Sequence, residues 1–202
     1  HIVDSVSCKT NLPRPEHEVE AEIAALCSQL AQRAGLDMAT QIASVGIGTP
    51  GSVNPHTGVV EFNANFGYRN WPLVSAMEKL LPCRVYIEND ANAAAYGEYI
   101  AGAAQGAKYA IAVTLGTGIG GGIIIDGKIF SGINSAGAEL GHTVIVKGGR
   151  PCMCGRRGCW EKYASARALA EDTLAAMEQH KDNIMWSYVH GDPARVNAKT
   201  AF

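Results

Sequence analysis

Residues 84–122, RVYIENDANAAAYGEYIAGAAQGAKYAIAVTLGTGIGGG, contain the alternation of elements that decides the fold class. The run from Arg84 to Ile87 combines β-branched and aromatic residues and predicts a strand. The alanine-rich segment 91–104 predicts a helix, and residues 109–114 predict a second strand that leads into a glycine-rich segment. Strands that alternate with helices favour an α/β fold.

The flanking sequence continues this alternation. Apolar residues recur at helical spacing from Glu16 and predict a helix that ends at Gly35. Pro72 marks the start of another helix, with Asn70 as its cap. Further strands are expected at residues 42–47 and 59–62, and Asp126-Gly127 predicts the tight turn of a hairpin. The glycine-rich segment 102–106 is a candidate joint between two domains, residues 1–106 and 107–202.

Composition excludes several classes of protein. The 202 residues are 47% hydrophobic and 18% charged, which is ordinary for a folded protein. A formal net charge of −2 gives no basic excess for nucleic acid or an anionic membrane. No apolar run approaches the length of a transmembrane helix, and the sequence does not open with a signal peptide. We therefore expect a cytoplasmic protein with no membrane or nucleic-acid partner.

A cysteine cluster carries the strongest chemical signal. Cys152, Cys154 and Cys159 lie within eight residues, and His142 precedes them. In a chain of this size without a secretion signal, such clustering indicates metal binding rather than a disulfide framework. Three thiolates and one imidazole are a common ligand set for structural Zn²⁺. The spacing alone leaves His142 less firmly assigned than the cysteines.

Two arginines lie inside the cysteine cluster. Arg156 and Arg157 are expected to lower the pKa of the thiols, which must be deprotonated to bind a metal. The alternative is that the three cysteines are buried or free thiols beside a surface histidine.

Asp90 lies between the predicted strand Arg84 to Ile87, after Glu88 and Asn89, and the helix that starts near Ala91. Ligands of open α/β sheets gather at the carboxyl ends of strands, where a carboxylate can act as a base. An aspartate at this position can instead cap the helix, which stabilises it by about 1 kcal/mol. Position alone favours the cap, whereas the neighbouring polar residues favour a catalytic role.

Two further motifs are weaker when taken singly. In the glycine-rich turn after Thr114, backbone N–H groups and the Thr117 hydroxyl could bind phosphate oxygens. The turn is not a P-loop, because no Gly-Lys-Ser/Thr ends it, and glycine-rich turns are common without phosphate. Glu139 and His142 are three residues apart, so one helical turn would place them on the same face. The alternative for Glu139 is an ordinary exposed glutamate.

Together these motifs resemble the ROK family, which includes bacterial glucokinases, other hexose and N-acetylhexosamine kinases, and sugar-responsive repressors. The resemblance extends from about Gly46 to Ala166. It rests on five segments in this order: residues 48–51 (GTPG), 88–92 (ENDAN), 115–122 (LGTGIGGG), 139–142 (ELGH) and 152–161 (CMCGRRGCWE).

The resemblance implies an actin-like, ribonuclease-H-like ATPase fold in two lobes, with a hexose and ATP bound in the cleft and Mg²⁺ on the phosphates. Asp90 would be the general base, and Thr117 and Gly118 would hold the terminal phosphates. His142 would both ligate zinc and face the sugar. The relatives are often homo-oligomers. The sugar contacts would come from Asn89, Asp90, Glu139, His142, Glu161, Gly51 and Asn65.

The sequence departs from the family pattern in two places. The N-terminal Asp-x-Gly-Gly-Thr phosphate loop and the later nucleotide-binding part do not occur, so we expect a fragment of a kinase that lacks most of the adenosine site. Glucose is the expected substrate, with N-acetylglucosamine, N-acetylmannosamine, mannose and fructose as alternatives. A sugar-responsive repressor, a non-catalytic sugar sensor and a zinc-stabilised interaction module are the competing functions.

Overall fold

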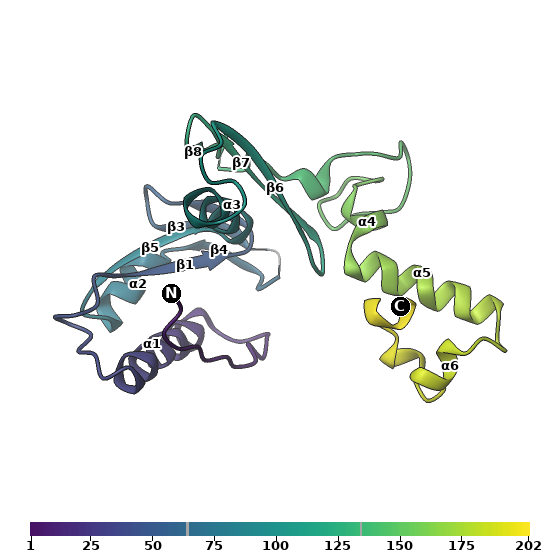
Figure 1. Cartoon of the computed structure of the whole chain (residues 1–202), viewed down its shortest axis with the longest axis horizontal. Helices are drawn as coiled ribbons and strands as arrows, with labels where there is room; N and C mark the ends of the chain where they lie inside the picture. Colours follow the sequence, from purple (N-terminus) through teal and green to yellow (C-terminus); the bar gives the residue numbers. More distant parts are fainter. Residues whose placement is uncertain (64, 134) are drawn as a thin grey trace. The chain divides into compact units, whose positions relative to one another are not determined.

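The computed structural model describes residues 1–63, 65–133 and 135–202, and it is mixed α/β as the sequence predicts (Figure 1). The chain forms two compact units. Unit 1 comprises residues 1–93 with 133–136, and unit 2 comprises residues 94–132 with 137–202. The division falls inside helix α3 (Asp90–Ala101). The expected lobe boundary after residue 106 stays a prediction.

Within the described residues, unit 1 contains two small sheets, the helices α1 and α2, and the first turn of α3 (Figure 1). Strands β1 and β5 are parallel, in a register that places Thr49 opposite Asn89 at their carboxyl ends. Strands β2, β3 and β4 form an antiparallel sheet in that order. The elements are α1 (Glu16–Arg33), β1 (Ser44–Thr49), β2 (Ser52–Asn54), β3 (Val59–Asn63), β4 (Tyr68–Trp71), α2 (Leu73–Leu80) and β5 (Arg84–Asn89).

The predicted end of α1 and the predicted start of α2 at Pro72 are confirmed, but the predicted cap of α2 is not. Helix α1 ends at Arg33, next to Gly35, as predicted. The cap of α2 is Pro72 itself, so the assignment of Asn70 as the cap is wrong. Asn70 lies within β4 and has a φ of 51°. The ring of Pro72 fixes φ near the helical value, so the helix can begin directly after it.

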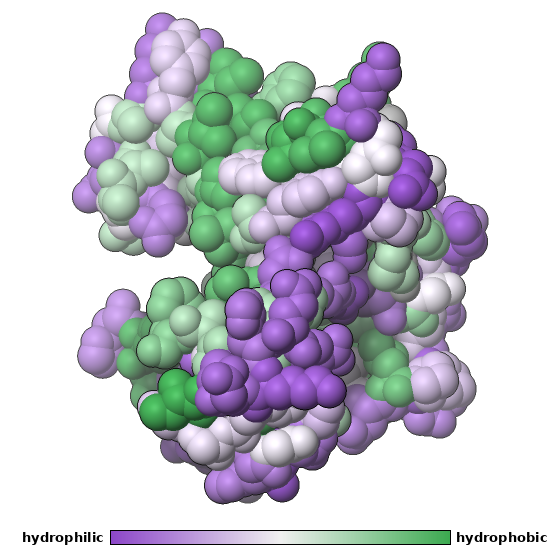
Figure 2. All heavy atoms as spheres, turned by 90° about the vertical axis from the view of Figure 1, so that its right-hand side faces the viewer, coloured by the Kyte–Doolittle hydropathy of each residue, from purple (hydrophilic) through white to green (hydrophobic). Residues whose placement is uncertain are grey.

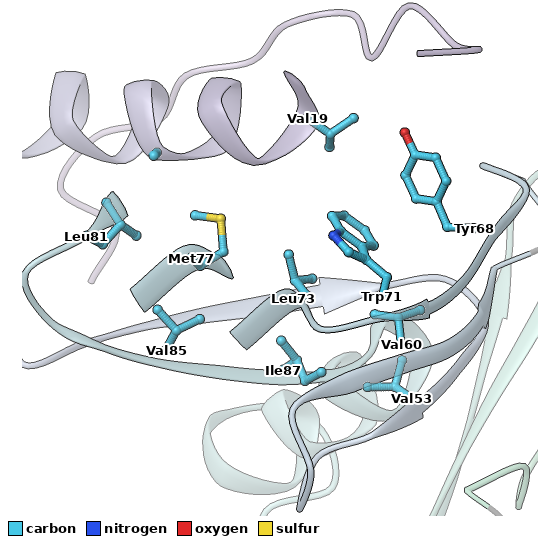
Figure 3. Close-up of a cluster of buried hydrophobic side chains, with 11 residues drawn as sticks. Val19, Val53, Val60, Tyr68, Trp71, Leu73, Met77, Leu81, Val85 and Ile87 are labelled. Carbon is cyan, nitrogen blue, oxygen red and sulfur yellow. The ribbon is translucent and has the colours of Figure 1, made fainter. Parts of the chain in front are cut away.

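The hydrophobic core of unit 1 lies between its helices and its sheets (Figure 3). Val19 of α1, Leu73 and Met77 of α2 and Ile87 of β5 point toward one another in this core. Trp71 is 2% exposed, and its Nε1–H donates to Oε1 of Glu20 at 2.6 Å. This hydrogen bond ties α1 to β4 and satisfies the only polar atom of the buried indole.

Unit 2 begins with the greater part of α3, which is followed by the antiparallel sheet β6-β7-β8 (Figure 1). Asp126 and Gly127 connect β7 to β8 with φ values of 49° and 75°, as the predicted primed turn requires. Ser165 caps α5 by accepting the N–H of Ala168 at 3.1 Å. The elements are β6 (Tyr109–Leu115), β7 (Ile119–Ile125), β8 (Lys128–Ile129), α4 (Glu161–Ala164), α5 (Ala166–Gln179), α6 (Met185–Tyr188) and three 3₁₀ helices (Leu140–His142, Pro193–Arg195, Ala198–Ala201).

Hydrophilic side chains surround patches of hydrophobic ones on the face shown in Figure 2. Among the described residues, none of the helices combines the length and the apolar character that crossing a membrane requires.

The core of unit 1 gives a stability prediction. Met77 is 0% exposed and Leu80 of the same helix is 48% exposed. Met77→Ala is expected to lower the free energy of unfolding by about 2–5 kcal/mol, because it removes buried methylene groups and leaves a cavity. Leu80→Ala, the matched control, should change it by less than about 1 kcal/mol. Urea unfolding followed by circular dichroism measures both, and equal losses would contradict this packing.

Candidate functional site

Asn89 and Asp90 lie at the junction of β5 and α3. Oδ1 of Asn89 accepts the N–H groups of Ala91 at 2.9 Å and Asn92 at 3.1 Å, so Asn89 caps the helix. Asp90 is exposed, and its Oδ1 accepts the same Ala91 N–H at 2.9 Å. The main capping role thus belongs to Asn89, which leaves the Asp90 carboxylate at the surface.

Asn89 also reaches the loop that follows β1. Its Nδ2 donates to the carbonyl oxygen of Gly51 at 3.1 Å. Gly51 has a φ of 100°, and a Cβ there would lie 2.2 Å from the carbonyl oxygen of Phe62. Only glycine fits this approach of two backbone segments. The expected sugar-binding residues Gly51 and Asn89 are therefore directly linked.

Asn63 is a residue of this region that the sequence analysis missed. It is completely buried, and its Oδ1 accepts the N–H groups of Asn65 at 3.0 Å and Phe66 at 3.1 Å. Its Nδ2 lies 3.5 Å from Oγ1 of the buried Thr49. Asn63 thus holds the turn that presents the exposed Asn65. The available signal was an asparagine at the end of an apolar strand, where its side chain can organise a turn.

The structure brings together the four expected metal ligands. The ligand atoms of His142, Cys152, Cys154 and Cys159 lie within 4.8 Å of one another. The Sγ atoms of Cys154 and Cys159 are 3.6 Å apart, close to the spacing of about 3.8 Å that tetrahedral Zn–S bonds of about 2.3 Å require. Nδ1 of His142 lies 3.5 Å from Sγ of Cys152. The donor set and its spacing fit Zn²⁺.

The three thiols differ in how readily they ionise. Burial raises the pKa of Cys152 to about 12 and also raises the pKa of Cys159. Burial acts in the same direction on Cys154, but hydrogen bonds from the side chain and backbone of Arg156 outweigh it and lower the pKa of Cys154 to about 6. Arg156 thus acts on a thiol as predicted, whereas Nε of Arg157 donates to the carbonyl oxygen of Gly148 at 3.3 Å.

Glu161 lies beside the expected metal ligands at the start of α4. Its Oε1 accepts from the Cys152 thiol at 3.0 Å and lies 3.5 Å from Nδ1 of His142. Its Oε2 would lie 2.8 Å from a Cβ on Gly118, so the glycine-rich turn passes close to this carboxylate. Glu161, the metal ligands and Gly118 therefore form one cluster within unit 2.

The glycine-rich run has two structural roles. Residues 116–118 form the turn between β6 and β7, where the N–H of Gly116 donates to the carbonyl oxygen of Gly118 at 3.0 Å and Thr117 is exposed. Residues 120–122 lie within β7 instead. A Cβ on Gly121 would lie 2.5 Å from Cγ of Leu140, so this glycine makes room for the segment that carries His142. The phosphate prediction accordingly concerns only the turn.

Glu139 and His142 belong to one helical turn, as the spacing predicts. The turn is a 3₁₀ helix with Glu139 at its cap position, and the His142 N–H donates to the Glu139 carbonyl oxygen at 3.1 Å. Glu139 is exposed, whereas His142 is half-buried. The expected site residues thus form two groups, one in each unit: Gly51, Asn65, Asn89 and Asp90 in unit 1, and Thr117, Gly118, Glu139, His142, Glu161 and the three cysteines in unit 2.

Comparisons with known proteins agree with the resemblance in the sequence. The sequence model described as the ROK family matches residues 2–199. Glucokinase of Halalkalibacterium halodurans is 41% identical over 145 residues, which are 71% of this chain and 44% of that protein. The xylose repressor of Bacillus subtilis is 41% identical over 128 residues, 63% of this chain and 33% of that protein.

A solved structure shares the fold. The crystal structure of a ROK family glucokinase from Streptomyces griseus, in complex with glucose and AMPPNP, matches with a TM-score of 0.81 at 37% identity. The match covers 93% of this chain and 59% of that one. The chain thus spans about half the length of the two glucokinases. The likeness confirms the expected α/β fold of the actin-like ATPase kind.

The metal-ligand loop, residues 144–159, gives a second stability prediction. Gly155 and Gly158 have φ values of 85° and 83°, but only at Gly158 would a Cβ clash, 1.7 Å from the carbonyl oxygen of Val146. Gly155→Ala should therefore cost only the left-handed backbone strain of about 1–2 kcal/mol. Gly158→Ala should cost about 1–3 kcal/mol more, because the backbone must shift. Thermal unfolding compares the two, and equal losses would show that the close approach is wrong.

Proposed function

Because the chain belongs to the ROK family, we propose that the protein containing it transfers a phosphoryl group from ATP to a hexose, with glucose as the substrate. The observation that carries the proposal is the Asp90 carboxylate, exposed at the end of β5 while Asn89 caps the following helix. The glucose bound to the Streptomyces griseus relative supports this choice of sugar.

Asp90 is the general base in this proposal. It accepts the proton of the attacking sugar hydroxyl as that oxygen forms its bond to the γ-phosphorus, while the bond from the γ-phosphorus to the β–γ bridging oxygen of ATP breaks and ADP leaves. Such a base needs hydrogen-bond reach of the hydroxyl rather than a large pKa shift. Phosphoryl transfer depends mainly on positioning and charge stabilisation. The hydrogen bond from the Ala91 N–H to Oδ1 of Asp90 supports the role, because it orients the carboxylate.

The other site residues bind and orient. The hexose hydroxyls are held by Asn89, Glu139, His142 and Glu161, with Gly51 and Asn65 contributing from their loops. The exposed turn with Thr117 and Gly118 holds the terminal phosphates of ATP through a hydroxyl and backbone N–H groups. Mg²⁺, when bound, neutralises charge on those phosphates.

We further propose that the cysteine–histidine cluster binds one structural Zn²⁺ through His142, Cys152, Cys154 and Cys159. Four protein ligands leave no open coordination position, so the metal would stabilise the site rather than react. Nδ1 of His142 faces the thiols, which leaves its Nε2 for the sugar. Oε1 of Glu161 lies close to both His142 and Cys152, which supports the proposal that the metal site and the sugar site are adjacent.

A sugar-responsive repressor is the second candidate function. The likeness to the Bacillus subtilis xylose repressor favours it, since the identity equals that to the Halalkalibacterium halodurans glucokinase. The two functions share sugar binding and differ in turnover. Homo-oligomeric assembly and the cytoplasmic location remain predictions.

Substitution of Asp90 distinguishes the two functions. In the full-length protein, Asp90→Asn is expected to lower kcat by about 10²–10⁴-fold, because the proton acceptor is lost, while sugar affinity changes little. Asp126→Asn, a matched exposed aspartate in the β7–β8 turn, should keep full activity. A coupled ADP-release assay with glucose, mannose, fructose, N-acetylglucosamine and N-acetylmannosamine measures turnover, and calorimetry measures sugar binding.

One outcome would contradict the role of Asp90, and another would contradict the kinase proposal. Full turnover of Asp90→Asn would remove the general-base role. If the unaltered protein binds a sugar tightly but produces no ADP from ATP with any of the five sugars, the repressor would be favoured.

Zinc binding has an expected proton count. Near pH 7.5, Cys152 and Cys159 hold their protons and Cys154 is a thiolate, so the thiols should release close to two protons per zinc. Below the Cys154 pKa of about 6 the count rises toward three, and the apparent affinity falls more steeply as the pH falls. Calorimetry in buffers of different ionisation enthalpy measures the count. Cys8→Ser should leave it unchanged, and a protein that binds no zinc would refute the assignment.

A further inference from the structure

The geometry points to Arg150 as a positioning residue that fixes the metal-ligand loop and helix α4 against α5. The inference rests on the proposed metal and sugar sites, and it concerns a side chain to which neither site assigns a role. Arg150 lies two residues before the ligand Cys152.

The backbone of Arg150 is held on both sides. Its N–H donates to the hydroxyl oxygen of Tyr163 at 2.7 Å, and its carbonyl oxygen accepts the N–H of Gly158 at 2.8 Å. Tyr163 belongs to α4, and Gly158 precedes the ligand Cys159. Arg150 therefore connects the segment next to Cys159 to the helix that carries Glu161.

The side chain of Arg150 adds contacts to two helices. Its Nη1 donates to the carbonyl oxygen of Lys162 in α4 at 3.0 Å. Nη1 and Nη2 donate to the two carboxylate oxygens of Asp172 in α5 at 3.2 and 2.7 Å. The guanidinium also lies over the ring of Tyr163, with 5.0 Å between its Cζ and the ring centroid. A planar guanidinium can make these contacts at once, and a lysine cannot.

The pair of Arg150 and Asp172 contributes to the placement of α4 through the geometry of its hydrogen bonds rather than through its charge. The side chains of Arg150 and Asp172 are 40% and 48% exposed, and ion pairs at such exposure add little stability. Helix α4 has only four residues and no side-chain cap, so its own hydrogen bonds fix it poorly. Arg150 supplies the missing constraint, because it binds the backbone of Lys162, next to Glu161, and anchors that contact on the longer α5.

Zinc release tests this role directly. In zinc-loaded full-length protein with excess chromophoric chelator, Arg150→Met should raise the zinc release rate about tenfold, the lower end of the effect of removing supporting contacts around metal ligands. Arg150→Lys should recover little, since it restores charge but not the paired hydrogen bonds. Asp172→Asn, a surface change that leaves the core intact, should raise the rate by a smaller factor.

Matched controls separate positioning from a general loss of stability. Glu171→Gln removes the same charge one residue earlier in α5. The Glu171 carboxylate makes only a long contact, 4.0 Å from Nζ of Lys162, so this variant should leave the zinc release rate unchanged. In the absence of zinc, the Asp172→Asn variant and the unaltered protein should unfold at the same urea concentration. Adding Asp172→Asn to Arg150→Met should raise the rate no further, because the two residues act through one contact.

The outcomes keep the inference distinct from the proposed metal site. An unaltered protein that binds no zinc refutes the metal site, and with it the role of Arg150. If the unaltered protein holds zinc and the Arg150→Met and Asp172→Asn variants release it at the rate of the unaltered protein, only the role of Arg150 is overturned. Equal acceleration by Glu171→Gln also overturns it, because charge rather than geometry would then explain the effect.

Discussion

Convergence of three thiols of the metal-ligand loop with the imidazole of His142 is the constraint on which the candidate site of unit 2 depends. The loop has little apolar core of its own: Cys152 and Cys159 are buried, whereas Val144, Ile145 and Val146 are 46%, 53% and 41% exposed. Hydrophobic burial therefore cannot fix the loop alone. A metal held by His142 and three thiolates would join the loop to the turn that carries Glu139. It would thereby fix the positions of the Glu139 and His142 side chains.

Short-range signals allowed much of this arrangement to be predicted from the sequence. The spacing of the cysteines predicted that three thiols lie close together, because a cluster within a few residues is brought together by local backbone geometry. The primed turn at Asp126-Gly127 was predictable for the same reason, since its φ values are a local property of the two residues. The end of α1 near Gly35 and the start of α3 at Asp90 also follow from residues within one turn of the boundary.

Contacts between distant segments were not predictable. Asn63 is completely buried and its Nδ2 lies 3.5 Å from Oγ1 of Thr49, fourteen residues earlier in the chain, and the residues around Asn63 do not indicate this contact. The role proposed for Arg150 depends on its contacts with Tyr163 and Asp172, which are thirteen and twenty-two residues away in the sequence. The error at Asn70 has a related cause: the residue resembles a cap in sequence, but pairing of its strand with β3 draws it into the sheet.

The junction of β5 and α3 shows how neighbouring residues divide their roles. An aspartate that begins a helix satisfies the criteria for a cap as well as those for a base, so sequence alone left the choice open. The structure gives the capping hydrogen bonds of Ala91 and Asn92 to Asn89, whose amide also contacts Gly51. A carboxylate that is not needed to terminate the helix can be exposed at its start, where the parallel strands end. The side chain that supports the helix therefore differs from the one available for chemistry, and a substitution at Asp90 can affect a reaction without removing the main cap of α3.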